Sequence, residues 1–139
     1  MMTDQDAYNA LSLYTLAHAN PEFIHQYIVD AYAAQHATAD SKPIYLDFAL
    51  AGLYLHNEKE YSGKEVQHAH IKLAKHKERL PHFVPMETRE AMTVHDALAV
   101  PPGMRRDDAI RAWSASVWDA YGDQRRQVAV WIDMELGLN

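Results

Sequence analysis

The sequence of 139 residues contains no cysteine. This absence excludes disulfide bonds, a catalytic thiol, and any zinc or iron–sulfur site built from cysteine. Glycine is scarce as well, with five residues, and none of them belongs to a glycine-rich loop of the kind that binds phosphate groups. The chemistry of any functional site therefore has to come from other side chains.

Long apolar runs are missing too. The most apolar stretch, residues 44–55, contains Asp47 and is far too short to span a bilayer. The first six residues include two acidic ones and no basic one, whereas a secretory signal peptide begins with basic residues followed by an apolar segment. We therefore expect a cytoplasmic protein with no membrane partner.

Basic residues are outnumbered by acidic ones, 13 against 19, which gives a formal net charge of -6. A protein that binds nucleic acid without sequence preference needs a basic face, so we expect no nucleic-acid partner. Hydrophobic residues make up 48% of the chain and charged residues 23%, a balance typical of soluble globular proteins. At this length we expect residues 1–139 to form a single helical domain.

Helical patterns cover most of the chain, and no segment alternates between apolar and polar residues as an amphipathic strand would. Capping residues and helical spacing of apolar residues predict the element bounds. The expected helices are 4–18, 21–37, 43–60, 63–78, a short one ending at Ala99, and a long one that begins at Asp107 or Asp108 and bends or divides near Gly122. The predicted fold class is all-α, a bundle of about five helices.

The segment 43–60 is apolar on nearly every side, which is typical of a helix buried in the centre of a domain. By contrast, Pro81 and Pro85 interrupt the helical pattern after the fourth helix. We expect a buried central helix and an irregular connection over about 79–92.

Histidine is the unusually abundant residue. The nine histidines are His18, His25, His36, His56, His68, His70, His76, His82 and His95. A short turn joins the second and third predicted helices, so they should pack antiparallel. In that arrangement His25 lies opposite His56, and Gly52, which has no side chain, allows the two backbones to approach closely.

The helix after Tyr61 turns back and brings His68 or His70 level with His56. Three nitrogen ligands with one open position are typical of catalytic zinc sites and related divalent-metal sites, with nickel and manganese as other candidates. The same histidines also fit a hydrogen-bonded cluster without any metal. The predicted metal ligands are His25, His56, His68 and His70, with Tyr32, Gln35 and His36 behind them as hydrogen-bonding neighbours.

Two segments, HQYIVDAYAAQHA at 25–37 and KPIYLDFALAGLYLHNEKEYSG at 42–63, resemble a bacterial family catalogued only as a domain of unknown function. The similarity continues through TVHD at 93–96 and WSASVWDAY at 113–121 and covers most of the chain. It implies a shared fold and supplies no activity. Some members carry a cysteine pair near the N-terminus, which this chain lacks. A looser similarity, of architecture only, is to metal-binding bundles of the DinB/YfiT type.

Two functions of different classes remain open. In the first, the chain is an enzyme whose bound metal activates water or a thiol for hydrolysis or group transfer. In the second, it is a non-enzymatic binding or oligomerisation domain whose C-terminal helix, rich in Trp and Tyr, packs on a partner or forms a homodimer. The sequence singles out no catalytic residue and no small-molecule ligand.

Overall fold

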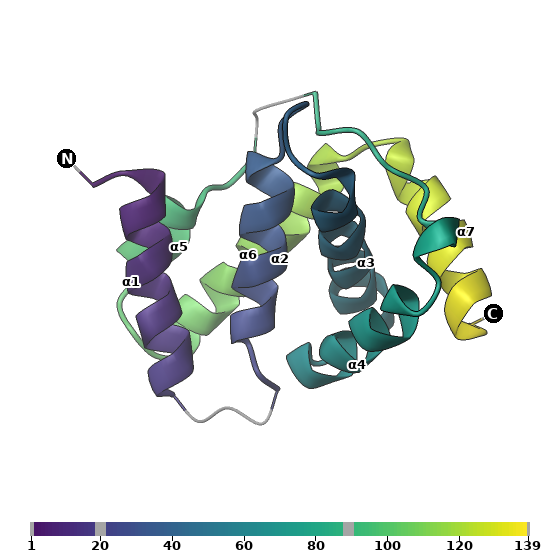
Figure 1. Ribbon diagram of the computed structural model, residues 1–139. Helices are drawn as coiled ribbons and strands as arrows, with labels where there is room; N and C mark the ends of the chain where they lie inside the picture. Colours follow the sequence, from purple (N-terminus) through teal and green to yellow (C-terminus); the bar gives the residue numbers. More distant parts are fainter. Residues whose placement is uncertain (1, 19–21, 88–90, 139) are drawn as a thin grey trace.

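The computed structural model describes residues 2–18, 22–87 and 91–138, and over these ranges it contains seven α-helices, one short 3-10 helix and no strand. The all-helical fold is confirmed, and the number of helices is higher than the predicted five. In chain order the elements are α1 (Asp4–Ala17), α2 (His25–His36), α3 (Pro43–Lys59), α4 (Gly63–Ala74), η1 (Lys77–Arg79), α5 (Val94–Ala99), α6 (Met104–Ala120) and α7 (Gln124–Leu136) (Figure 1).

Capping boxes fix the first turns of α1 and α4. The Thr3 hydroxyl accepts a hydrogen bond from the Asp6 backbone N–H at 3.0 Å, and the Asp6 carboxylate accepts one from the Thr3 N–H at 3.1 Å. Ser62 and Glu65 form the same reciprocal pair at the start of α4. These bonds satisfy N–H groups that have no partner inside the helix. Both predicted starts are confirmed.

Other predicted bounds were wrong. Helix α2 begins at His25 instead of residue 21, because Phe23 has φ of 55°, a left-handed conformation that a right-handed helix excludes. The predicted cap at Asn20-Pro21 lies outside the described residues. Helix α4 ends at Ala74 instead of 78, and α6 begins at Met104, earlier than predicted. Gly122, with φ of 56°, separates α6 from α7.

Helix α3 lies at the centre of the molecule and contacts α2, α4, α6 and α7 (Figure 1). Its side chains from Ala49 to His56 are all buried, as expected for a helix that is apolar on nearly every side. Helices α1 and α5 pack together at one end of the molecule, and α7 lies at the other end (Figure 1). Helix α6 packs against both α2 and α3.

The aromatic side chains of α6 and α7 face the interior. The rings of Trp113, Trp118 and Trp131 are between 0% and 8% exposed, and Tyr121 is 3% exposed. The Trp113 indole N–H donates to the Gln35 side-chain oxygen at 2.9 Å, and the Tyr121 hydroxyl donates to the backbone oxygen of Ala34 at 2.6 Å. These aromatic residues are therefore part of the chain's own core.

The connection between η1 and α5 is irregular in its described parts, as predicted. The buried Asp47 carboxylate accepts hydrogen bonds from the backbone N–H groups of His82 and Phe83 at 3.0 and 2.9 Å. The Gln124 side chain bonds both the N–H and the C=O of Val84, each at 3.0 Å. Side chains from α3 and α7 thus supply the partners that a helix would otherwise provide.

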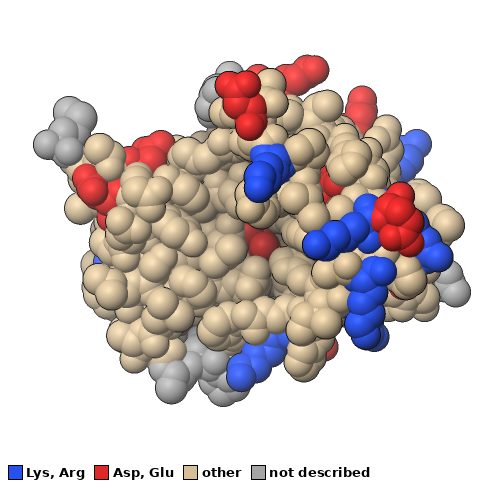
Figure 2. Space-filling view, viewed as in Figure 1, with Lys and Arg blue, Asp and Glu red and all other residues tan. Residues whose placement is uncertain are grey.

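The surface carries charges of both signs. On the face drawn in Figure 2, Lys and Arg side chains gather toward the side of η1 and α7, and Asp and Glu are more frequent toward α1 and the upper edge. Over the described ranges, no helix has the length and apolar character needed to cross a membrane.

Candidate functional site

A buried ion pair joins α2 to α3. The Asp30 carboxylate oxygen Oδ2 lies 3.2 Å from Nε2 of His56, and the two side chains are 3% and 1% exposed. Gln26, one turn earlier on α2, donates from its amide nitrogen to Oδ1 of Asp30 at 3.0 Å. Both carboxylate oxygens therefore have partners, as a buried charge requires.

Both ring nitrogens of His56 face hydrogen-bond acceptors. Nε2 faces Asp30, and Nδ1 lies 3.3 Å from the backbone oxygen of Tyr61. A ring with a proton on Nε2 donates to the buried Asp30 carboxylate, and a second proton on Nδ1 would let it donate to the Tyr61 oxygen as well. Tyr27 packs on the same imidazole, with ring centroids 3.8 Å apart, and donates to the Tyr61 oxygen at 3.1 Å.

Gly52 makes room for this ion pair. A Cβ atom at position 52 would collide with the Asp30 carboxylate. The contact agrees, to within one residue, with the predicted antiparallel pairing of the second and third helices. Gly52 does allow a close approach, but the group that approaches is the Asp30 side chain.

The side of α2 that faces α3 differs from the sequence prediction, which placed His25 opposite His56. Gln26 and Asp30 lie on the buried side of α2, where they are 7% and 2% exposed. His25 turns toward α1 instead, where its Nδ1 lies 2.9 Å from the Thr15 hydroxyl. Burial lowers the pKa of His25. The group that the structure brings to His56 is therefore Asp30.

A pocket opens beside the ion pair. It has a volume of about 380 Å³ and is bordered by α2, α3, α6 and the segments that flank them. Its lining residues are Glu22, Tyr27, His56, Asn57, Glu60, Arg111 and Ser114. Arg111 donates to the Glu22 carboxylate at 2.6 Å, and Asn57 donates to the Ser114 hydroxyl at 3.1 Å. Every residue of the lining thus carries a hydrogen-bonding side chain.

A larger hollow of about 690 Å³ lies at the turn between α6 and α7. Its lining, which includes Glu58, Arg125 and Arg126, consists of exposed and half-exposed residues. This hollow is a depression of the charged surface. The pocket beside the ion pair is the better candidate site because it reaches the buried side chains of His56 and Ser114.

Two residues next to the pocket have strained backbones. Glu60, the C-cap of α3, has φ of 57°, and Phe23, which follows the pocket residue Glu22, has φ of 55°. Non-glycine residues in this left-handed region cost of the order of 1 kcal/mol, and such strain is concentrated at functional sites. Sequence reasoning missed this pocket, because its residues come from distant parts of the chain.

The predicted metal ligands contact different partners. His25 bonds Thr15, His56 bonds Asp30, and Nε2 of His70 lies 2.8 Å from the backbone oxygen of Phe48. His68 is exposed on α4. Across the described ranges, no three His, Asp or Glu side chains are placed so that they could hold a metal ion. A metal bound by His25, His56, His68 or His70 stays a prediction.

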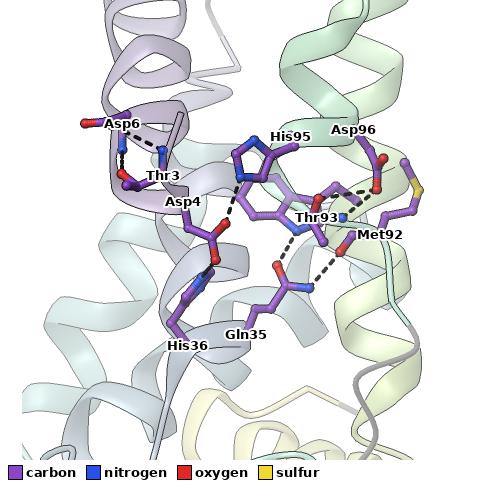
Figure 3. A network of polar contacts seen from close by, with 10 residues as sticks. Thr3, Asp4, Asp6, Gln35, His36, Met92, Thr93, His95 and Asp96 are labelled. Carbon is purple, nitrogen blue, oxygen red and sulfur yellow. Dashed lines mark hydrogen bonds and ion pairs between the residues drawn. The ribbon is translucent and has the colours of Figure 1, made fainter. Parts of the chain in front are cut away.

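The three predicted neighbours of the metal lie along α2 toward α1, α5 and α6. Gln35 accepts from Trp113 and donates to the Met92 backbone oxygen at 2.7 Å (Figure 3). Tyr32 stacks on His36, with ring centroids 3.9 Å apart. His36 reaches Asp4 at the first turn of α1 (Figure 3). All three connect α2 to other elements of the fold.

These features define a small all-helical protein with a polar pocket beside a buried Asp–His ion pair. The chain belongs to the family of unknown function DUF5946, whose profile matches residues 5–122. This match confirms the resemblance to a domain of unknown function and carries no activity with it. No curated protein and no solved structure matches the chain at a significant level.

Proposed function

We propose that this protein binds a small hydrophilic molecule in the pocket beside Asp30 and His56. The observation that carries the proposal is the polar lining around a volume of about 380 Å³. Ligand pockets are typically between about 300 and 1,000 Å³ in volume. Most of them are largely apolar, so a lining made of polar side chains selects a ligand rich in hydrogen-bonding groups.

The ion pair supports the proposal by holding one wall of the pocket in place. Asp30 and Gln26 on α2 fix the His56 ring on α3, and Tyr27 packs against that ring. A binding site whose side chains are already oriented loses less conformational entropy when a ligand binds. The pair therefore serves as a support for the pocket, and Arg111, Asn57 and Ser114 offer groups that a ligand can contact.

Arg111 allows a test with a matched control. Its side chain is 41% exposed and paired with Glu22, and Arg125 on α7 is also 41% exposed and paired with Asp119.

The test uses backbone-amide NMR titrations with three sets of small probes: carboxylates, amines and uncharged polyols. We expect one set to shift the amide signals of Asn57, Glu60 and Arg111, and Arg111→Gln to weaken that binding about tenfold, the loss of one charged hydrogen bond. Arg125→Gln should leave it unchanged. The proposal fails if no set shifts these signals, or if both variants weaken binding equally.

Glu60 provides a second prediction, in which stability and binding change in opposite directions. Glycine adopts positive φ without steric cost, so Glu60→Gly should raise the free energy of unfolding by about 1 kcal/mol. The same change removes a carboxylate from the pocket lining, so we expect weaker binding of the probe found with the wild type. Urea denaturation measures the first effect and NMR titration the second. A stabilised variant with unchanged affinity would exclude Glu60 from the binding site.

This proposal differs from both hypotheses drawn from the sequence. It requires no metal, and it places the ligand away from the aromatic side chains of α6 and α7, which are buried. Homodimer formation stays a prediction, which light scattering can test.

A further inference from the structure

Three titratable side chains meet where α1, α2 and α5 come together. Asp4, the first residue of α1, directs its two carboxylate oxygens at two histidines (Figure 3). Oδ1 lies 2.7 Å from Nε2 of His95 on α5, and Oδ2 lies 3.0 Å from Nε2 of His36 on α2. One carboxylate thus connects the start of α1 to two other helices.

The second ring nitrogen of His36 also faces an acceptor. Nδ1 lies 3.0 Å from the backbone oxygen of Tyr32, while Nε2 faces Asp4. A neutral ring has a proton on one nitrogen only, so it would set a lone pair against either the carbonyl or the carboxylate. The arrangement around His36 is satisfied when both nitrogens carry protons. The Tyr32 ring stacked on His36 favours the same charged form.

The neighbouring carboxylates do not compete with Asp4 for the two histidines. Asp6 on α1 accepts from Thr3, and Asp96 on α5 accepts from Thr93, each within its own capping box. The tyrosines near Asp4 are Tyr32 and Tyr8, whose rings are tilted against each other with centroids 4.3 Å apart. Hydrogen bonds from His36, and next from His95, lower the pKa of Asp4.

Helix α1 has few other anchors. Its buried residues are Ala7, Leu11 and Thr15. At its C-terminal end Tyr14 donates to Asp107 at 2.8 Å, and Thr15 contacts His25. Because apolar burial is the main source of docking energy for a helix, a helix with so small a buried face also depends on polar contacts.

We propose that Asp4, His36 and His95 form a pH-dependent clasp that holds the N-terminal half of α1 against α2 and α5. The side chains are 56%, 33% and 38% exposed, so protons reach them from solvent without unfolding. Loss of the histidine protons as the pH rises weakens the clasp and lets α1 detach more often from the rest of the bundle.

The sign of the pH dependence follows from the two kinds of group. Histidine side chains generally lose their charge between pH 5 and 8, so the stabilisation is present at the acidic side of this interval and is lost as the pH rises through it. The lowered pKa of Asp4 sets the other limit, because stabilisation from a carboxylate with a depressed pKa disappears as the pH falls through that pKa. The clasp is therefore closed in mildly acidic solution.

Hydrogen exchange of backbone amides tests the proposal on the full-length protein, in buffer that contains a chelator. Dividing each measured rate by the intrinsic rate at that pH gives an opening constant for the central amides of α1. Between about pH 5.5 and pH 8 we expect this constant to rise by about fivefold for each ion pair lost, the upper range for exposed pairs. Amides of α6 should show no such rise.

Glutamine variants separate the clasp from other causes. The double variant His36→Gln/His95→Gln keeps hydrogen-bond donors but cannot titrate, so its α1 opening constant should be independent of pH. His76→Gln, which removes another exposed histidine paired with a carboxylate, should retain the wild-type pH dependence. An opening constant that does not change with pH in the wild type overturns the proposal. So does an unchanged pH dependence in the double variant.

Discussion

His56→Ala is expected to lower the free energy of unfolding by about 3–5 kcal/mol, because it leaves the buried Asp30 carboxylate without its histidine partner. Asp30 would keep its hydrogen bond from Gln26, which is too little to compensate a buried charge. Urea denaturation followed by tryptophan fluorescence measures the change. The exposed His68 is the control, since His68→Ala should change stability by less than about 0.5 kcal/mol.

The same variant tests the metal prediction. If the cost is that of a stranded carboxylate, it is the same in a chelator and in the presence of added zinc, nickel or manganese. If His56 binds a metal, the cost appears only with the ion, and elemental analysis of protein purified without an affinity tag gives close to one metal per chain. A cost that depends on metal would overturn the ion-pair explanation.

Gly52→Ala is expected to destabilise the protein by about 3 kcal/mol, the upper range for overpacking a core. The added methyl group would collide with the Asp30 carboxylate, which cannot move aside while Gln26 and His56 hold both of its oxygens. This result reverses the usual effect, because alanine is favoured over glycine inside a helix by about 1 kcal/mol.

A double-mutant cycle with Asp30→Ala identifies the colliding group. When the Asp30 side chain has been removed, Gly52→Ala should become neutral or stabilising, because only the helix preference for alanine remains. Thermal unfolding of the four proteins supplies the cycle. Equal destabilisation in both backgrounds would mean that the methyl group meets something other than Asp30.

The sequence predicted local features better than contacts between helices. The capping boxes at Thr3 and Ser62 involve residues three apart, and they mark the true starts of α1 and α4. The buried character of α3 follows from its composition alone. The start of α2 could not be predicted in this way, because nothing in the residue type of Phe23 signals its positive φ.

The rotation of α2 shows why Asp30, and not His25, faces His56. A helical wheel assumes one apolar face, but α2 is packed against α1, α3, α4 and α6 and has little free surface. In such a position a polar residue can be buried when a partner is present, as Asp30 is beside His56. That partner is 26 residues away in the chain, so no local pattern reveals it. The pocket was missed for the same reason, since Arg111 and Glu22 lie 89 residues apart.

The irregular connection between η1 and α5 divides the chain into two segments that are incomplete without each other. Trp113 and Tyr121 of the second segment bond to Gln35 and Ala34 of the first, and α5 packs on α1. The two segments are therefore interleaved, and neither can shield its apolar residues by itself. Cleavage after Glu87 would therefore leave two fragments, each with apolar surface that the other fragment covers in the intact fold.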